Sequence, residues 1–334
     1  MDCLRVALLY NLQHPAIADP DAPSDIFADQ DRLETVQAVE QALRGAHVPA
    51  LLEMLNIPYT GSGVLSHALA LDKAAAKRIW EDRGLPTAPF QVMHHAEESL
   101  CQSLRQFPLF VKPLNESASA GIGEDAIVWD EAQLRQRVAW MVDNYHQPAL
   151  VERFLPGREF SVAILGNAQG TGQPSMQSPN GRHSYRFFPV LELVGMPDGE
   201  PVGDRTEDAV KARKAKTSYT YVCPAPIPEL AGTLQALSTA AFEAVSAVDL
   251  ARVDFRCDVD GRPYLLEIDT LPSMEQGRSR YIKMAEAGGM PFFELVNTIL
   301  GLAMHRYHLE ISEPAILFGR NQEAQWLKPL SEMS

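Results

Sequence analysis

The sequence predicts an α/β (α+β) protein of two or three domains, and three observations support this prediction. First, the chain has 334 residues, whereas one domain commonly holds about one to two hundred. Second, short apolar runs that are typical of strands alternate with segments of helical periodicity. Third, 46% hydrophobic and 22% charged residues are ordinary for a globular protein and exclude global disorder.

Charge and composition narrow the class of function. With 29 Lys and Arg against 43 Asp and Glu, the net charge is −14. Such a chain is a poor candidate for binding nucleic acid or an anionic membrane, because both need a positive surface. No apolar run has the length of a membrane span, and residues 1–10 are unlike a signal peptide. The four cysteines lack metal-site spacing, which favours a cytoplasmic enzyme or binding protein with reduced thiols: Cys3, Cys101, Cys223 and Cys257.

The first quarter of the chain predicts mostly helices. Asp31 and Glu34 have the spacing of a capping box, and Gly45 is a natural end for the helix that follows. The other elements expected here are a strand over 4–10, a loop over 11–29, helices over 48–55 and 66–83, and a short strand leading into a turn over 57–63.

Strands become frequent from residue 89 onward. Apolar runs predict strands over 90–93, 109–112, 126–128, 149–152 and 160–165, with helices over 96–106 and 131–143. Segments 166–184 and 195–217 are interpreted as long loops, which are often functional in a compact domain. The rest predicts helices over 228–248, 279–287 and 291–305, a strand pair over 251–258 and 264–268 that turns at Asp260–Gly261, and an extension after 309.

The strongest chemical signal lies on that strand pair. Arg252 and Asp254 point to the same face of one strand because side chains alternate with a period of two, and Glu267 and Asp269 do the same on the next. Three carboxylates on one face repel each other unless a cation lies among them. Carboxylate oxygens suit Mg²⁺ together with substrate phosphates, and Arg252 suits a phosphate or a developing oxyanion. A solvated face of alternating charges explains any single residue, but explains all four poorly.

A second signal is Lys112 followed by a loop of small residues up to Gly123. Such a loop exposes backbone N–H groups that suit phosphate oxygens, with Lys112 as a point charge. The P-loop pattern is absent, and loops of small residues are common, so the signal is weak by itself. Lys73 lies on an Ala-rich helix, where a single lysine is usually only solvated.

A third signal is a strand that leads through a Pro-Gly turn into another strand over 151–160. Extended backbone of this kind offers donors and acceptors to a flat heterocycle. Glu152 suits an exocyclic amine and Glu159 suits ribose hydroxyls. Taken alone, a hairpin with two exposed glutamates is the preferred interpretation.

In combination, these motifs resemble the ATP-grasp superfamily, close to the D-alanine–D-alanine ligase family. The resemblance covers residues from about 48 to 302. It is carried by residues 51–62 (LLEMLNIPYTGS), 71–73 (LDK), 111–113 (VKP), 151–160 (VERFLPGREF), 222–225 (VCPA), 252–254 (RVD) and 266–272 (LEIDTLP).

The resemblance implies an ATP-grasp fold, in which two α+β subdomains sandwich ATP after a reduced N-terminal α/β domain. The expected boundaries are 1–88 for the N-terminal domain, 89–165 for the small subdomain, 166–310 for the subdomain with the metal and substrate site, and 311–334 for an extension. It further implies ATP, two Mg²⁺ ions with Mn²⁺ as an alternative, amino-acid substrates, a homodimer and a role in peptidoglycan synthesis for the cell wall.

The implied reaction is the ATP-dependent joining of two amino acids through an acyl phosphate. The resemblance assigns ATP contacts to Lys73, Lys112, Ser119, Glu152, Phe154, Leu155, Glu159 and Leu266. It assigns the metal to Asp254, Glu267 and Asp269, and catalysis to Arg252 and to Ser119 in the phosphate-covering loop. Arg252 and Ser279 are expected to contact substrate, although the spacing at Ser279 is one residue off the family's pattern.

Departures from the family pattern leave two alternatives open. Asp269 stands where the family usually has Asn, the glutamate expected near the first strand has no match in 10–15, and several dozen residues are missing after Gly45. No loop lysine falls in a clear register for the γ-phosphate: Lys211, Lys214 and Lys216. The alternatives are a ligase for a different amino acid or peptide, and a non-catalytic ATP-binding descendant that has lost the first-substrate site.

Overall fold

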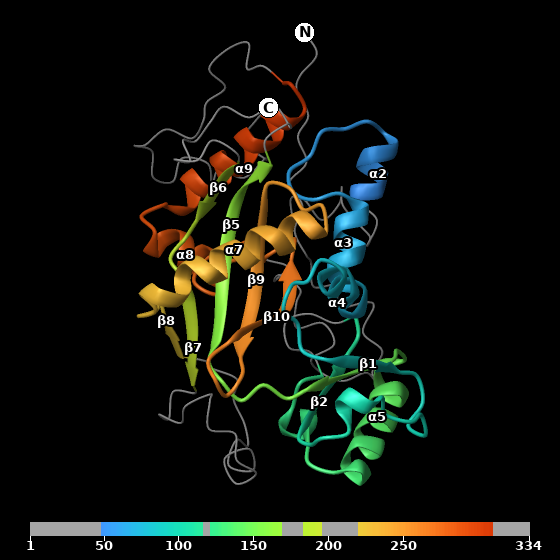
Figure 1. Cartoon of the computed structure of the whole chain (residues 1–334). Coiled ribbons are helices and arrows are strands. Elements are labelled where there is room, and N and C mark those ends of the chain that lie inside the picture. The colour runs from blue at the N-terminus through green and yellow to red at the C-terminus, as the bar shows by residue number, and fades with distance from the viewer. Residues whose placement is uncertain (1–47, 116–120, 169–182, 196–219, 310–334) are drawn as a thin grey trace, which may run out of the picture.

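The computed structural model describes residues 48–115, 121–168, 183–195 and 220–309. Its strands form two antiparallel sheets, one of four strands and one of six; in Figure 1 the larger sheet runs down the left and centre and the smaller sheet lies at the lower right. The strand expected over 4–10, the helix after Asp31, the extension over 311–334 and most of both long loops lie outside the described residues.

The smaller sheet has the strand order β1-β4-β2-β3. Its strands are β1 (Phe90–Met93), β2 (Leu109–Pro113), β3 (Ile127–Val128) and β4 (Ala149–Arg153). Helix α5 (Glu131–Tyr145) covers one face, where it buries Leu134, Val138 and Met141 against alternate strand residues such as Val111 and Val151. The other face carries Lys112 and Glu152, which are therefore turned away from α5.

The larger sheet has the order β10-β9-β5-β7-β8, and β6 also pairs with β5. Its strands are β5 (Glu159–Ala168), β6 (His183–Phe187), β7 (Leu191–Gly195), β8 (Thr220–Val222), β9 (Leu250–Cys257) and β10 (Pro263–Asp269). The central strand β9 is buried along its whole length between β5 and β10.

The two faces of the larger sheet differ in chemistry. Helix α7 (Pro228–Ala244) packs on one face against an apolar row that includes Phe160, Val253 and Phe255. The other face is apolar only where α8 (Arg280–Ala287) and α9 (Phe292–Arg306) cover it, over residues such as Ala163 and Leu250. Beyond these helices the same face carries the charged residues of β9 and β10.

Helix α4 (Lys73–Asp82) connects the two sheets. It contacts β1 of the smaller sheet and β10 of the larger one, and its Trp80 is fully buried in the core of the larger sheet. The segment after it adds a parallel bridge from Thr87 to Leu265. Figure 1 shows α4 between β1 and β10, with α3 (Val64–Leu71) and α2 (Val48–Met54) above it.

The structure confirms most of the expected elements and corrects several. The single helix predicted over 66–83 is two helices, because the Asp72 side chain accepts from Ala75 N and starts a new helix at Lys73. The helix predicted over 96–106 is only a 3₁₀ turn over Gln102–Leu104. The segment 57–63 forms no named strand, and the sequence analysis missed β6, β7 and β8.

The division into sheets also falls at a different place from the expected boundary. Strand β5 belongs to the larger sheet through its pairing with β9, so the chain crosses between sheets after β4 and before Glu159. The boundary predicted after 165 lies instead near the far end of β5. At this crossing the backbone of Gly157 passes close to β9, and only glycine fits, because a Cβ there would lie 2.6 Å from the carbonyl oxygen of Cys257.

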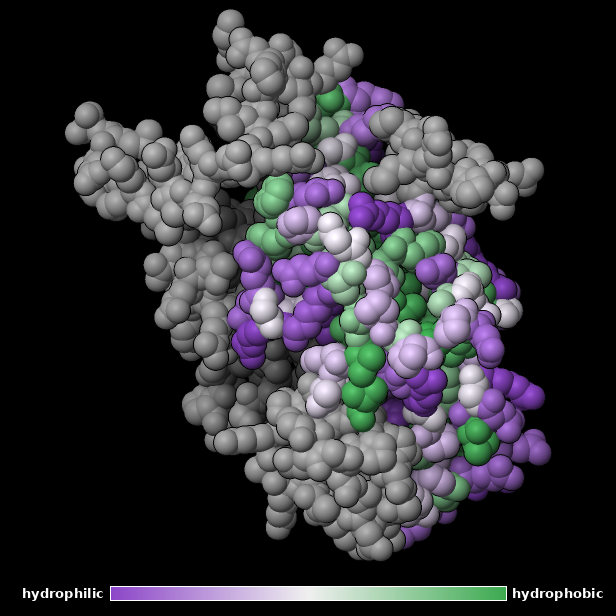
Figure 2. Space-filling model, turned by 90° about the vertical axis from the view of Figure 1, so that its left-hand side faces the viewer, coloured by the Kyte–Doolittle hydropathy of each residue, from purple (hydrophilic) through white to green (hydrophobic). Residues whose placement is uncertain are grey.

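Within the described residues, no single helix is long and apolar enough to cross a membrane. Only α8 and α9 together pass that test, and they are bent by 102° relative to each other. Both helices bury residues in the core of the larger sheet, among them Tyr281, Ile282 and Leu295. On the face drawn in Figure 2, hydrophobic and hydrophilic side chains of the described part are interspersed.

Candidate active site between the two sheets

Arg252 lies at the centre of a group of carboxylates on the larger sheet. Its Nε is 3.0 Å from Asp254 Oδ1, its Nη1 is 2.9 Å from Asp269 Oδ2, and its Nη2 is 3.8 Å from Glu267 Oε1. These four residues, which we call the carboxylate cluster, are the four that the sequence places on one strand pair. The prediction that they converge is confirmed.

A β-bulge in β10 makes this convergence possible. Leu265 pairs with Phe255, but Glu267 pairs with Asp254, so Leu266 is an extra residue without a counterpart in β9. Leu265 faces the apolar core under α7. Without the bulge, Glu267 would point to that same core, because side chains two apart share a face. The bulge therefore turns Glu267 and Asp269 to the face that carries Arg252.

The electrostatics of the cluster keep its buried members ionised. Burial by itself raises the pKa of Asp254, but the charges of Arg252 and Arg280 outweigh it and lower that pKa to about 2. Burial by itself lowers the pKa of Arg252, and the three carboxylates raise it above the usual arginine value. Asp254 is buried, whereas the side chains of Glu267 and Asp269 are 24% and 22% exposed. The carboxylates of Glu267 and Asp269 are thus the part of the cluster that solvent reaches.

The start of helix α8 closes one side of the carboxylate cluster. Arg280 Nη1 lies 3.5 Å from Asp254 Oδ2 and 3.2 Å from Ser161 Oγ, and Ser161 donates to Asp254 Oδ1 at 2.6 Å. Ser279 caps α8, because its Oγ accepts from Ile282 N. Sequence analysis predicted Ser279 near the site but missed Arg280 and Ser161, which no recognised motif contains.

A second group of charges lies on the smaller sheet. Glu152 Oε1 is 2.7 Å from Lys77 Nζ, and Glu152 Oε2 is 2.6 Å from Lys112 Nζ. We call these three residues the lysine cluster, and they are all buried. Burial by itself raises the pKa of Glu152, but the two lysines outweigh it and lower that pKa to about 2. Glu152 is therefore not the exposed glutamate of the simpler interpretation.

Helix α4 supplies Lys77 to the lysine cluster and places Lys73 beside the carboxylate cluster. Lys73 Nζ is 4.0 Å from Glu267 Oε2, and Lys77 follows one turn later. Residues four apart lie on the same side of a helix, so α4 turns both lysines toward the space between the sheets. Lys77 was not among the residues chosen from the sequence, since a lysine on an Ala-rich helix resembles a solvated one.

A third set of predicted residues lies around Arg256. Its Nη1 is 2.7 Å from Glu159 Oε2, its Nε donates to the Leu155 carbonyl oxygen at 2.6 Å, and its guanidinium is 5.9 Å from the centre of the Phe154 ring. Glu159, Leu155 and Phe154 are thus held together, by an arginine that sequence analysis missed. Leu266 lies half-buried at the bulge of β10.

The predicted metal ligands satisfy the chemistry of a hard cation but are arranged around Arg252. Three carboxylates on adjoining strands are the donors that Mg²⁺ prefers. In the described part of the chain, however, no three His, Cys, Asp or Glu side chains converge on a common metal position. The donor set fits Mg²⁺ best at Glu267 and Asp269, whose partly exposed oxygens are the accessible ones.

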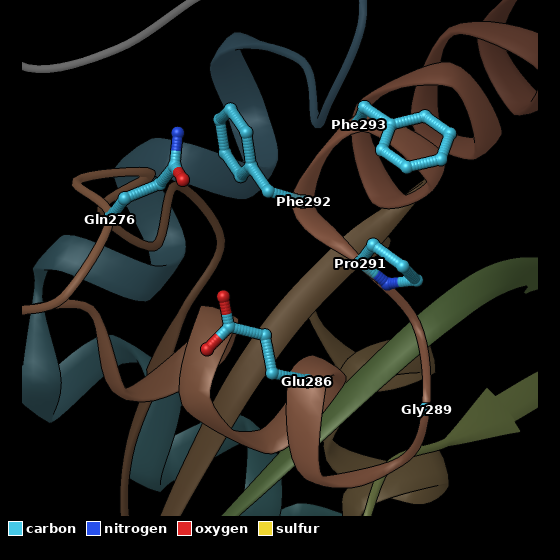
Figure 3. Close-up of a pocket in the computed structure, with 6 residues that line it drawn as sticks. All are labelled: Gln276, Glu286, Gly289, Pro291, Phe292 and Phe293. Carbon is cyan, nitrogen blue, oxygen red and sulfur yellow. The ribbon is translucent and has the colours of Figure 1, made fainter. Parts of the chain in front are cut away.

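Some expected site residues and one surface hollow lie apart from this arrangement. Ser119, Lys211, Lys214 and Lys216 lie outside the described residues. A hollow of about 640 Å³ at the turn between α8 and α9 is lined by Gln276, Glu286, Gly289, Pro291, Phe292 and Phe293. In Figure 3, Gln276 and Phe292 face each other across it, while Phe293 lies on the far side of Pro291. None of these residues belongs to either cluster.

Comparison with known proteins identifies the family of this chain. A family model described as D-ala D-ala ligase C-terminus matches residues 79–187 and 207–301. The D-alanine–D-alanine ligase of Syntrophotalea carbinolica is 36% identical over 298 residues, which cover 87% of this chain and 86% of that protein. An uncharacterized protein of Sinorhizobium fredii is 37% identical over 272 residues, which cover 81% of this chain and 74% of that one.

Solved structures agree with the sequence relatives. The D-alanine–D-alanine ligase of Bacillus anthracis has a TM-score of 0.61 at 25% identity, covering 78% of this chain and 76% of that one. A second structure of the Bacillus anthracis enzyme, complexed with ATP, has a TM-score of 0.61 at 22% identity and covers 84% of this chain and 88% of that one. The chain therefore belongs to the D-alanine–D-alanine ligase family and has its ATP-grasp fold.

Proposed function

We propose that this protein is an ATP- and Mg²⁺-dependent ligase that joins the carboxylate of one amino acid to the amine of another. The observation that carries the proposal is the carboxylate cluster, in which Arg252 lies among three carboxylates and opposite a group of buried lysines. Transfer of a phosphoryl group needs positioned cations and metal-binding carboxylates more than a covalent catalyst. Family membership supports the same reaction.

The first step activates a carboxylate. One oxygen of the first amino acid attacks the γ-phosphorus of ATP, and ADP leaves, so that an acyl phosphate forms. In this proposal Lys73 and Lys112 pair with phosphate oxygens, with Ser119 in the loop that covers them. Asp254, Glu267 and Asp269 would hold two metal ions. Mg²⁺, or Mn²⁺ in its place, neutralises charge on the transferring group when it is bound.

The second step forms the amide. The amine nitrogen of the second amino acid attacks the acyl carbon, the bond from that carbon to the phosphate oxygen breaks, and the nitrogen loses a proton. Arg252 stabilises the negative oxygen of the tetrahedral intermediate, which is where an oriented guanidinium contributes most. Ser279, at the start of α8 beside Arg280, contacts the second substrate.

The adenosine site follows from the residues around Arg256. Glu152 accepts from the adenine amino group together with backbone groups near Leu155, and Phe154 and Leu266 contact the ring from either side. Glu159 accepts from the ribose hydroxyls. The pairing of Arg256 with both Glu159 and the Leu155 carbonyl supports this proposal, because it fixes two of these groups relative to each other before a ligand binds.

Substrate identity and assembly are the finer parts of the proposal. D-Alanine is the substrate named for the relatives, and joining two D-alanines would serve peptidoglycan synthesis. The homodimer and the cytoplasmic location, with no nucleic-acid or membrane partner, stay predictions. Exposed apolar side chains on and beside α2 and α3 are consistent with association: Leu51, Met54, Leu55 and Leu65.

A phosphate-release assay tests the proposed function. The purified protein is given Mg²⁺ and ATP with single and paired amino acids, D-alanine included, and the products are identified by mass. We expect phosphate release that depends on a particular pair, with ADP and a dipeptide. Phosphate release with a peptide or with a different amino acid would identify another substrate, and the proposed ligase reaction would stand. Binding of ATP without release for any pair would instead favour a non-catalytic descendant.

A further inference from the structure

The lysine cluster holds one more positive charge than its carboxylate needs. Glu152 is 2% exposed, and each of its oxygens has a lysine nitrogen within 2.7 Å. One lysine would be enough to balance a single carboxylate. Placing a second cation in a buried position is costly, since charges leave water only at a large energetic cost unless they are paired. The second lysine therefore calls for an explanation.

The two lysines are held differently. Lys77 comes from the middle of α4 and is fully buried, and its Nζ also donates to Thr87 Oγ1 and lies 5.4 Å from the centre of the Phe90 ring. Thr87 in turn donates to the Leu265 carbonyl oxygen at 3.1 Å. Lys77 is thus fixed by contacts to both sheets. Lys112 stands near the end of β2, on a flexible four-carbon stem, and Glu152 is its one ion-pair partner among the described residues.

We propose that Lys77 is a positioning residue that acts as the permanent counter-ion of Glu152, so that Lys112 can move from Glu152 to a phosphate oxygen of ATP. This inference rests on the proposed function, in which Lys112 contacts the phosphates of ATP. When Lys112 leaves, the buried carboxylate of Glu152 is still paired, because Lys77 remains beside it. Glu152 also keeps its position, which the adenine contact requires.

Removing Lys77 should therefore weaken nucleotide binding through Lys112. In Lys77→Met, Glu152 has Lys112 as its remaining lysine partner, and moving Lys112 to a phosphate would leave the buried carboxylate unpaired. We expect the Mg²⁺ complex of a non-hydrolysable ATP analogue to bind about tenfold more weakly. The variant keeps a neutral Glu152–Lys112 pair and the Thr87–Leu265 hydrogen bond, so the fold should persist.

A double variant separates this role from a general loss of packing. In Glu152→Gln the carboxylate charge is gone, so Lys112 has no buried anion to neutralise. Adding Lys77→Met to Glu152→Gln should then leave the affinity at the level of Glu152→Gln alone. If the double variant loses a further tenfold, the two changes are independent and Lys77 is not the counter-ion that we propose.

Two further variants complete the experiment, which uses isothermal titration calorimetry with the analogue and a thermal melt for every protein. Thr87→Val removes a neutral contact of Lys77 but keeps its charge beside Glu152, so its affinity should match the wild type. A loss equal to that of Lys77→Met would overturn the inference, because contacts between the sheets would then explain both.

Lys112→Met separately tests the proposed contact between Lys112 and the phosphates of ATP, on which the inference rests. If the wild-type protein does not bind the analogue, or if Lys112→Met binds it as tightly as the wild type, the proposed phosphate contact fails and the inference fails with it. If Lys112→Met weakens binding but Lys77→Met does not, the proposed function stands and only the inference about Lys77 is wrong.

Discussion

The carboxylate cluster and the lysine cluster are opposite solutions to burying charge in one protein. In the first, a single arginine is shared by three carboxylates, two of which reach the surface. In the second, a single glutamate is shared by two lysines, and all three are buried. Arg280 and Lys73, from helices α8 and α4, lie 3.5 Å from Asp254 and 4.0 Å from Glu267, so other elements complete the balance of charge in the carboxylate cluster. The lysine cluster keeps one lysine in excess.

The clusters also differ in how the chain builds them. Adjacent strands of one hairpin carry the carboxylate cluster, so its geometry is set by the pairing of β9 and β10. The lysine cluster joins strands β2 and β4 to helix α4, so its geometry depends on tertiary packing. Strand pairing sets distances more rigidly than a contact between a helix and a sheet. From the proposed roles of their residues, we expect substitutions in the carboxylate cluster to change turnover and substitutions in the lysine cluster to change nucleotide affinity.

The largest effect is expected from Arg252→Ala. Three carboxylates then lose their shared cation, and the tetrahedral intermediate loses its guanidinium. We expect turnover to fall by about 10³-fold, with the affinity for ATP nearly unchanged because the role of Arg252 lies in the transition state. Steady-state phosphate release and analogue binding measure the two quantities. An equal fall in affinity and turnover would make Arg252 a ground-state binding residue instead.

A smaller loss is expected from Glu267→Gln, which keeps the size of the side chain but removes one negative donor. We expect Mg²⁺-dependent turnover to fall by about 10²-fold and to recover in part at high Mg²⁺. Glu275→Gln is the matched control, because Glu275 pairs only with the exposed Arg278 among its described ion pairs. Equal turnover in both variants would remove Glu267 from the metal site.

The carboxylate cluster could be predicted from the sequence almost completely, and the lysine cluster only in part. A period of two places Arg252 with Asp254 and Glu267 with Asp269, whatever the rest of the fold does. The bulge at Leu266 that brings both pairs to one face has no recognised signal in the sequence. It nevertheless left the prediction intact, because the charged residues are too polar to face the apolar core under α7.

The lysine cluster shows why tertiary contacts escape the sequence. Lys112 and Glu152 were found through their motifs, but Lys77 lies on a helix whose neighbours are far along the chain. Nothing local distinguishes it from a solvated lysine. Arg280 and Arg256 were missed for the same reason. The break of one predicted helix at Asp72 was readable in principle, since an aspartate before a helical segment is a common N-cap.

A buried ion pair outside both clusters provides a reference for them. Asp249 is fully buried, accepts from Gly61 N at 2.8 Å and lies 2.8 Å from Arg306 Nη2. Asp249→Asn should lower the free energy of unfolding by about 3 kcal/mol, because Arg306 loses its charged partner. Urea unfolding measures this loss. Turnover measured well below the unfolding midpoint should be unchanged; a loss there would mean that this pair also shapes the site.

Both clusters also make stability depend on pH. The pKa of Glu152 falls from an ordinary value of 4.5 to about 2 on folding, and that of Asp254 from 3.8 to about 2. A carboxyl group with a lowered pKa stabilises the folded state fully above its unfolded pKa and loses that contribution as the pH falls toward the folded value. The contribution of these two carboxyl groups to the unfolding free energy should therefore stay level from pH 7 to about 5 and fall between about 4.5 and 2.

Two variants test whether the clusters cause this loss of unfolding free energy in acid. Glu152→Gln and Asp254→Asn each remove one titrating carboxyl, so each should make the acid slope of the unfolding free energy shallower than in the wild type. The slope for Glu152→Gln should begin to differ at a higher pH, because Glu152 has the higher unfolded value. If both variants keep the wild-type slope, other carboxyl groups control acid unfolding, and the two clusters matter for chemistry and binding but not for stability in acid.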